Sequence, residues 1–294
     1  MHQRGALVLL AVAVGAAGVT LSRRPGPEPH RGAFLDPEGL AVGPEGTIYV
    51  ADEDSHVLSA WSPTGQLLAR SRPDPVPPGE LTTTGGSLVA LGPGRVLAVG
   101  AWDLFRAELG PAGWSLAGRL GPFHELEDVV VDEAGLLYLA IEGPRHIRVL
   151  DPAGGFLRQL ALPEEPEALC IDGPRLLVAY SKACYVGVHD RQTGAELARI
   201  GLRGWASELD TPDDVVVGPD GLIYVSDQGH HQIQVFERDG RLIRTLCRRG
   251  AAPGELDTPE DIAFGPDGLL WVADSGNRRV QALTRLGAPV RVIQ

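Results

Sequence analysis

Apolar residues come in short runs along the chain, separated by Gly, Pro and Asp, and two C-terminal stretches share one pattern. The first reads ELDTPDD from Glu208 to Asp214, then VVVGPDGLIYVSD to Asp227. The second reads ELDTPED from Glu255 to Asp261, then IAFGPDGLLWVAD. In both, two apolar runs flank a Gly-Pro-Asp-Gly sequence, whose residues favour a tight turn. The pattern predicts a strand, a turn and a second strand in each copy.

The same pattern recurs in phase along the chain. With Asp214 as the reference position, its equivalents lie 40 to 49 residues apart, at Gly39, Leu88, Asp128, Ala168 and Asp261. A period in this range, with short strands, is typical of β-propellers. Because one such unit cannot bury both faces of its sheet alone, the units are expected to close into a ring. Six units fit, at residues 34–72, 80–120, 124–161, 165–201, 207–247 and 254–294.

Each unit carries four segments of strand length, which in the fifth unit are residues 214–217, 222–226, 232–236 and 241–246. The first is a continuous apolar run, as expected for a strand packed on both faces, whereas the third alternates Gln232 and Gln234 with apolar residues. No stretch after residue 35 keeps a helical period. The prediction is an all-β fold: a six-bladed β-propeller of four-stranded antiparallel blades, preceded by an apolar N-terminal segment.

Closure of the ring can be predicted from the two ends of the repeat region. The last unit has its own fourth strand near residues 290–293. We therefore expect closure without a blade split between the termini, with Phe34 as a residue that could extend the first blade by a short stretch.

The first residues form a separate segment. Arg4 precedes an apolar run over residues 6–21, which has the length of a secretory signal core and is shorter than a comfortable membrane span. Ser22, Arg23 and Arg24 follow it directly, as in an uncleaved anchor. We predict a signal peptide or membrane anchor at residues 1–22, a Pro/Gly-rich linker at 23–33 and the propeller at 34–294. The protein is then extracytoplasmic, periplasmic or secreted, or attached to the membrane through residues 6–21.

Charge and cysteine content narrow the function classes. The net charge of −12 argues against nucleic acid as a partner, because such proteins need a clustered basic surface. Cys170, Cys184 and Cys247 include no C-x-x-C pair, so a thiolate metal site and a disulfide framework are both disfavoured. Cys170 and Cys184 fall on the first and third strands of one unit, about 9–10 Å apart, which is too far for a disulfide. Free thiols are expected.

One position in each unit is a candidate for chemistry. The residue before the reference position should lie at the mouth of the central channel, and in five of the six units it is acidic. We call these five residues the acidic ring: Glu38, Glu127, Glu167, Asp213 and Glu260; the sixth position is Ser87. Carboxylates that converge on one axis repel one another, which raises pKa values unless a cation compensates. The acidic ring is thus predicted to bind a ligand, with Ca²⁺ or another divalent cation as the candidate metal. The alternative is that these acids bond backbone amides at strand starts or extend into solvent.

The repeat also carries a family resemblance. The sequence WVADSGNRRV from Trp271 to Val280, YVAD from Tyr49 to Asp52, and Gly229-His230-His231-Gln232-Ile233 resemble NHL repeats. The resemblance implies a six-bladed propeller and leaves the activity open, because one fold serves many functions.

Two enzyme groups of this architecture are similar more distantly. The gluconolactonase and senescence-marker group implies a divalent metal at the channel mouth held by acidic and Asn side chains, but the only Asn is Asn277, in a peripheral turn. The peptide-amidating lyases imply zinc held by His at the starts of the inner strands, where this chain has none. His124, beside Glu125 and Glu127, is the one weak candidate for proton transfer.

Three functions remain open from the sequence. The first is a binding module that recognises a peptide, protein or small molecule at the channel mouth. The second is a lactonase-like hydrolase or lyase that depends on a divalent metal at the acidic ring. The third is a propeller whose acids serve solubility alone. No phosphate loop or nucleophile elbow is present, and the recurring Asp52, Asp227 and Asp274 are expected to fix the turn after the second strand.

Overall fold

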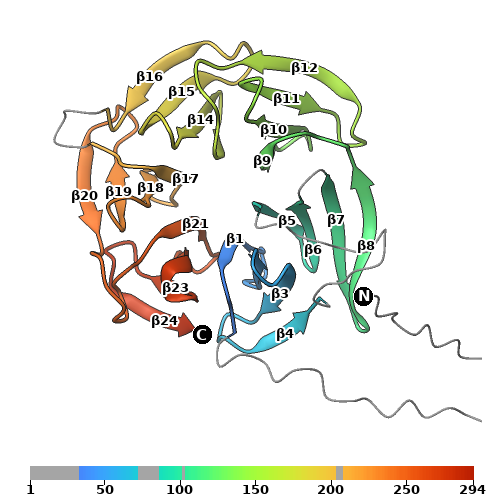
Figure 1. The fold of residues 1–294 in the computed structure, drawn as a ribbon, viewed down its shortest axis with the longest axis vertical. Coiled ribbons are helices and arrows are strands. Elements are labelled where there is room, and N and C mark those ends of the chain that lie inside the picture. The colour runs from blue at the N-terminus through green and yellow to red at the C-terminus, as the bar shows by residue number, and fades with distance from the viewer. Residues whose placement is uncertain (1–32, 72–85, 101–102, 203–207) are drawn as a thin grey trace, which may run out of the picture. The chain divides into compact units, whose positions relative to one another are not determined.

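The structure, a computed structural model, describes residues 33–71, 86–100, 103–202 and 208–294. The predicted signal or anchor at 1–22 and nearly all of the predicted linker lie outside these residues. The described residues form six four-stranded antiparallel sheets arranged as blades around a central channel (Figure 1). In every sheet the hydrogen-bonded order follows the order along the chain. The predicted six-bladed all-β propeller is therefore confirmed.

The blades coincide with the six predicted units. Blades 1 to 3 contain β1 (Pro37–Val42), β2 (Ile48–Asp52), β3 (Val57–Trp61), β4 (Leu67–Arg70), β5 (Leu88–Gly92), β6 (Arg95–Val99), β7 (Leu104–Gly110), β8 (Gly113–Leu120), β9 (Leu126–Val131), β10 (Leu137–Ile141), β11 (His146–Leu150) and β12 (Phe156–Ala161). Blades 4 to 6 contain β13 (Leu169–Asp172), β14 (Arg175–Tyr180), β15 (Tyr185–Asp190), β16 (Glu196–Ile200), β17 (Pro212–Val217), β18 (Ile223–Asp227), β19 (Gln232–Phe236), β20 (Leu242–Leu246), β21 (Pro259–Phe264), β22 (Leu270–Asp274), β23 (Arg279–Leu283) and β24 (Pro289–Ile293).

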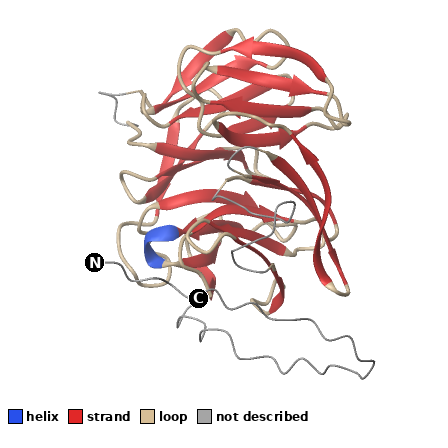
Figure 2. Cartoon of the chain, turned by 45° about the vertical axis from the view of Figure 1, so that its right-hand side comes forward, coloured by secondary structure: helices blue, strands red, loops and turns tan. Residues whose placement is uncertain are grey.

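Helical structure is nearly absent from the part of the chain that the structure describes. There, the one helix is the single 3₁₀ turn η1 (Ser275–Asn277), which appears in blue among the strands of Figure 2. None of the described residues belongs to a helix long and apolar enough to cross a membrane.

The tight turns explain why strands 1 and 2 of a blade pair as they do. In blade 5 the N–H of Gly218 donates to the carbonyl of Leu222 at 2.8 Å, and the N–H of Gly221 donates to that of Gly218 at 2.9 Å. Gly221 has a φ of +76°, which a side-chain-bearing residue rarely adopts. The Gly-Pro-Asp-Gly sequence is thus the turn that was predicted.

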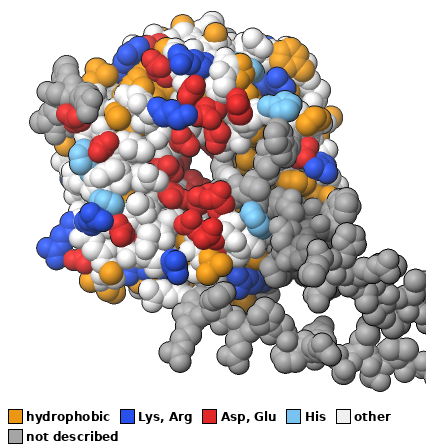
Figure 3. Space-filling model, in the orientation of Figure 1, with side chains coloured by type: hydrophobic (Ala, Val, Ile, Leu, Met, Phe, Trp, Pro, Cys, Tyr) orange, Lys and Arg blue, Asp and Glu red, His pale blue; other side chains and the backbone are white. Residues whose placement is uncertain are grey.

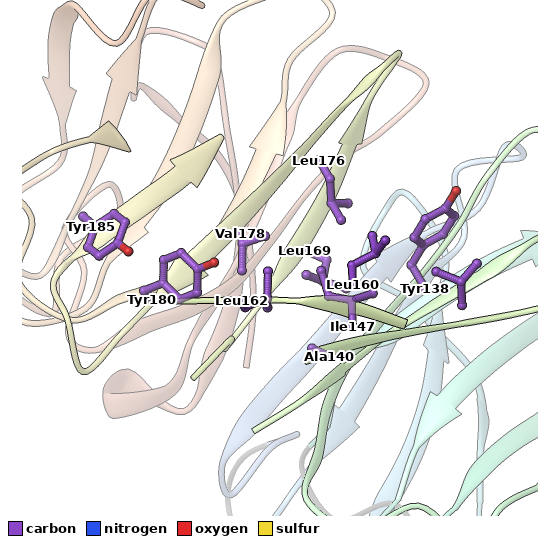
Figure 4. Packing of buried hydrophobic residues seen from close by; sticks show 11 residues of the cluster. Tyr138, Ala140, Ile147, Leu160, Leu162, Leu169, Leu176, Val178, Tyr180 and Tyr185 are labelled. Carbon is purple, nitrogen blue, oxygen red and sulfur yellow. The ribbon is translucent and has the colours of Figure 1, made fainter. Parts of the chain in front are cut away.

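Apolar side chains pack between neighbouring blades. The second strands β2, β10, β18 and β22 are buried along their whole length. Between blades 3 and 4, Tyr138 and Ile147 lie in one cluster with Leu169 and Tyr180 (Figure 4). Burial of each large side chain of this kind contributes about 1.5–3 kcal/mol, so the inter-blade layers stabilise the ring.

Blade 6 closes the ring against blade 1. Phe34, which is 3% exposed, packs with Trp61 at a centroid distance of 5.3 Å, in one cluster with Trp271 and Ile293. All four strands of blade 6 come from one continuous stretch of chain. Closure therefore occurs without a split blade, as expected, and Phe34 contributes a packed side chain and no strand.

The central Gln residues of the third strands in blades 5 and 6 do not face solvent. Gln234 is 3% exposed, and its amide nitrogen donates to Asp227 at 2.6 Å and to the carbonyl of Glu208 at 2.8 Å. Gln281 occupies the same position in blade 6 and bonds Asp274 in the same way. An outward polar face would be the wrong interpretation of the alternation of Gln with apolar residues, because buried aspartates accept hydrogen bonds from these amide nitrogens.

Candidate acidic site at the channel mouth

The five residues of the acidic ring line one cavity at the mouth of the channel. The cavity has a volume of about 320 Å³, and Ser87 also contributes to its wall. Figure 3 shows acidic side chains around the hollow at the centre of the face in view. Each comes from the start of a first strand or the residues just before it, as the repeat phase predicted. Among the described residues that line this cavity, none is Lys, Arg or His.

A second layer of carboxyl groups lies directly behind the ring. We call Asp128, Asp214 and Asp261 the inner aspartates. Each accepts a backbone N–H of the next blade: Asp128 from Leu169 at 2.6 Å, Asp214 from Ile262 at 2.9 Å, and Asp261 from Leu40 at 2.6 Å. These bonds join blades 3 to 4, 5 to 6 and 6 to 1. The inner aspartates are therefore structural links as well as part of the cavity wall.

Gly39 holds the reference position in blade 1, where a larger residue would not fit. A Cβ atom built there would lie 2.3 Å from the carbonyl oxygen of Gly86. Blades 1 and 2 thus approach through their backbones at the position where blades 3, 5 and 6 have an aspartate.

Burial raises the pKa of every carboxyl group of the acidic ring. Burial together with a hydrogen bond to Glu53 and the charge of Glu260 raises the pKa of Glu38 to about 10. Burial and the neighbouring Glu167 and Glu142 raise the pKa of Glu127 to about 7, and burial raises that of Glu260 to about 7. The pKa values of Glu167 and Asp213 also rise, first through burial and then through nearby carboxylates.

The inner aspartates show the same effect. Burial raises the pKa of Asp128 to about 7 and raises the pKa values of Asp214 and Asp261, which lie against each other. Eight carboxyl groups around one cavity therefore favour the protonated state more than ordinary carboxyl groups do. Without a cation, the cavity holds protons near neutral pH.

One part of the site brings carboxylates close enough for a single metal ion. Oxygen atoms of Asp36, Glu38 and Glu53 lie within 4.8 Å of one another. Among the described residues this is the one such group of three, so the other four members of the acidic ring share the cavity with Glu38 without meeting it around one point. Carboxylate oxygens are ligands of hard cations such as Ca²⁺, and the donor set fits that class of ion.

Two members of this group were not predicted from the sequence. Asp36 precedes β1, and Glu53 follows β2 directly, at the position that Glu142, Gln228 and Ser275 hold in other blades. The pairing of Pro37 with Asp52 brings this turn beside the start of the first strand. Comparison of the residue that follows the second strand in each repeat would have indicated Glu53 as a further residue of the mouth.

Other predicted residues lie away from the cavity. His124 is exposed before β9 and is not among the residues that line the cavity. Asn277 donates to Asp274 and to the carbonyl of Gly250 in the turn after β22, so the Asn ligand implied by the gluconolactonase resemblance is missing from the mouth, where Gln228 is the described residue with an amide side chain. Cys170, Cys184 and Cys247 are free thiols.

The recurring aspartates at the ends of second strands are structural, as expected. The carboxylate of Asp274 accepts from the N–H of Asp257 at 2.7 Å and from Nε of Arg279 at 2.6 Å, and Asp227 and Asp52 bond the equivalent segments of their blades. These bonds join the segment before the first strand to the end of the second strand. The aspartates therefore hold more of the blade than the turn after the second strand, which was the predicted role.

Comparison with known proteins agrees with this architecture. The NHL repeat family model matches residues 34–59, 209–236 and 256–283, in blades 1, 5 and 6. No protein of curated function matches the sequence significantly.

Solved structures with a similar fold come from several bacteria. Virginiamycin B lyase from Staphylococcus aureus, in a catalytically inactive form with quinupristin, is 15% identical with a TM-score of 0.60, covering 88% of this chain and 84% of its own. A gluconolactonase from Xanthomonas campestris is 17% identical with a TM-score of 0.62, covering 82% and 84%. An auxiliary nutrient binding protein from Bacteroides thetaiotaomicron is 14% identical with a TM-score of 0.65, covering 84% and 68%. At these identities the likeness concerns the fold. The chain is a six-bladed β-propeller in which segments of blades 1, 5 and 6 match the NHL repeat.

Proposed function

We propose that this protein is a binding module that recognises a positively charged ligand at the mouth of its channel. The ligand is a divalent cation or the cationic group of a peptide, protein or small molecule, and the acidic ring is its site. The N-terminal segment at residues 1–22 exports the module or anchors it to the membrane, so the ligand is met outside the cytoplasm.

The observation that carries this proposal is the set of eight carboxyl groups with raised pKa values around a cavity whose described lining includes no basic residue. Their deprotonated forms are unfavourable while the cavity holds no cation, because burial and mutual repulsion both oppose the charge. A cation that enters removes the repulsion and displaces protons. Binding is therefore expected to strengthen as the pH rises from 5 to 8.

Thermal melting of the full chain tests the proposal. The protein is melted with a chelator, then with Ca²⁺, Mn²⁺ or Zn²⁺, and separately with ethylammonium as an organic cation. A ligand at a hundredfold excess over its Kd stabilises the native state by about 2.7 kcal/mol. We expect a rise in Tm that Glu127→Gln and Asp213→Asn abolish.

Matched controls lie outside the cavity. Glu108 on β7 and Asp239 in the turn before β20 are both exposed, so Glu108→Gln and Asp239→Asn should keep the full shift. An unchanged Tm with millimolar concentrations of each of these cations would contradict the proposal.

A second function is favoured by the group of Asp36, Glu38 and Glu53. A divalent cation held there would polarise a carbonyl group, and Glu127, whose pKa burial raises to about 7, is suited to act as a general base near neutral pH. Proteins named a lyase and a gluconolactonase share the fold. A screen of lactones and esters with each metal tests this second function. The enzyme hypothesis requires turnover that Glu38→Gln and Glu127→Gln remove. Metal binding without turnover would contradict the enzyme hypothesis and support the binding module.

A further inference from the structure

The acidic mouth continues into a second cavity of different chemistry. This deeper cavity has a volume of about 370 Å³ and lies among the first strands of the blades. Its wall shares Ser87 and the three inner aspartates with the mouth. The two cavities therefore adjoin along the channel, and the inner aspartates mark the level at which they meet.

Beyond the inner aspartates the wall is apolar. Val89, Ala90, Val216, Ala263 and Phe264 contribute to it. Each inner aspartate has an oxygen that accepts a backbone N–H group of a neighbouring blade, and this oxygen therefore points into the wall of the channel. The channel thus changes from carboxyl groups to hydrocarbon along its length, and each half has the size of a small-molecule site.

Asp213 is the member of the acidic ring that we expect to meet a cationic group in the cavity. No hydrogen bond or ion pair joins its carboxyl group to another described residue, and the effects on its pKa are burial and repulsion from other acids. The residue lines the cavity and is partly exposed within it. A cationic group in the cavity would supply the partner that this carboxylate lacks.

We propose that the channel binds an amphiphilic organic cation, an alkyl- or arylammonium whose charged head lies at Asp213 and whose apolar tail extends past the inner aspartates. This proposal rests on the proposed function of the mouth and adds the class of ligand. A bare metal ion would leave the apolar half unused. A lysine side chain that entered from the mouth would bring its ammonium group to the carboxyl groups there and would also leave the apolar half unused, so a ligand with a charged head and an apolar tail that extends inward fits better.

The proposal predicts how affinity depends on tail length. Transfer of each methylene group from water into the apolar half should raise the affinity about fourfold. Four additional methylene groups, from ethylammonium to hexylammonium, should therefore raise it roughly 200-fold, with a plateau once the tail fills the cavity.

Isothermal titration of the full chain at pH 8 tests this with ethyl-, butyl-, hexyl- and octylammonium, and with hexanoate as a tail of opposite charge. We expect the length dependence for the ammonium series and no binding of hexanoate. Asp213→Asn should weaken every ammonium ion. Ala90→Leu, and independently Ala263→Leu, should weaken hexylammonium at least tenfold and change ethylammonium or Ca²⁺ less than twofold, because they fill the apolar half only.

Controls and contrary results are distinct. Leu197→Ala changes an apolar residue that is 59% exposed on β16 and should leave the series unchanged. Binding of Ca²⁺ or ethylammonium without length dependence would overturn the amphiphile proposal and leave the cationic mouth intact. Failure of every cation to bind would overturn both. Length dependence that survives Asp213→Asn and both Leu variants would place the tail elsewhere and overturn this proposal.

Discussion

The carboxyl group of Glu260 allows the cost of the acidic mouth to be measured directly. Burial and the charges of Asp36, Glu53 and Glu167 raise its pKa from 4.5 to about 7, and a hydrogen bond to Ser275 opposes part of this rise. Because the folded-state pKa is the higher one, the folded protein binds the proton more tightly than the unfolded chain does. Stability from this group is complete below about pH 4.5 and is lost as the pH rises to about 7.

Replacement of Glu260 by Gln keeps the shape and removes the ionisation. The interval between 4.5 and about 7 corresponds to roughly 3 kcal/mol, and partial contact with water in the channel reduces the expected effect to about 1–3 kcal/mol. We therefore expect Glu260→Gln to be more stable than the natural protein by about 1–3 kcal/mol at pH 8 in a chelator. At pH 4 the two should be equally stable.

Urea denaturation, followed by circular dichroism, measures this difference at both pH values. Glu108→Gln serves as the control, because an exposed substitution outside the cavity should change the free energy of unfolding by less than about 0.5 kcal/mol at either pH. A loss of stability in Glu260→Gln at pH 8, or an equal gain at pH 4 and pH 8, would refute the electrostatic reasoning.

Three further substitutions test the fold that holds the site. Asp274→Ala removes the carboxylate partner of Arg279, which is 2% exposed, and should cost about 3–5 kcal/mol in urea denaturation, whereas Asp267→Ala in an exposed turn of the same blade should cost less than about 1 kcal/mol. Phe34→Ala empties the packed position at the closure of the ring and should cost about 3–5 kcal/mol in the same assay; a change below about 1 kcal/mol would show that Phe34 does not hold the ring. Gly39→Ala forces two backbones apart and should lower the Tm with a cost of about 1–3 kcal/mol; an unchanged Tm would contradict the close approach.

The architecture could be predicted because a propeller repeats one local pattern. The Gly-Pro-Asp-Gly turn of blades 5 and 6 and the aspartate that ends the second strand in blades 1, 5 and 6 fix the phase of the repeat, and the other blades keep only part of this pattern. Once the phase was known, the position before Asp214 identified all five members of the acidic ring, which the structure places in one cavity. The turn residues therefore allowed the site to be predicted from the sequence.

The sequence could not predict contacts between residues at different positions of the repeat. The group of Asp36, Glu38 and Glu53 forms because the end of β2 pairs with the start of β1. The bonds from the inner aspartates to the next blade, and the burial of Gln234 against Asp227, depend on packing in three dimensions. An alternation of polar and apolar residues cannot distinguish a solvent-facing strand from one whose polar groups are satisfied inside the protein.

The central claim is that the mouth exchanges protons for a cation. Calorimetric titration of Ca²⁺ or ethylammonium into the full chain at pH 7, in two buffers with different heats of protonation, counts the protons released for each cation bound. We predict saturable binding of at least one of them with net proton release, and loss of both in Asp213→Asn but not in Asp239→Asn. Absence of binding at millimolar concentrations, or binding without proton release that Asp213→Asn leaves unchanged, would contradict the account.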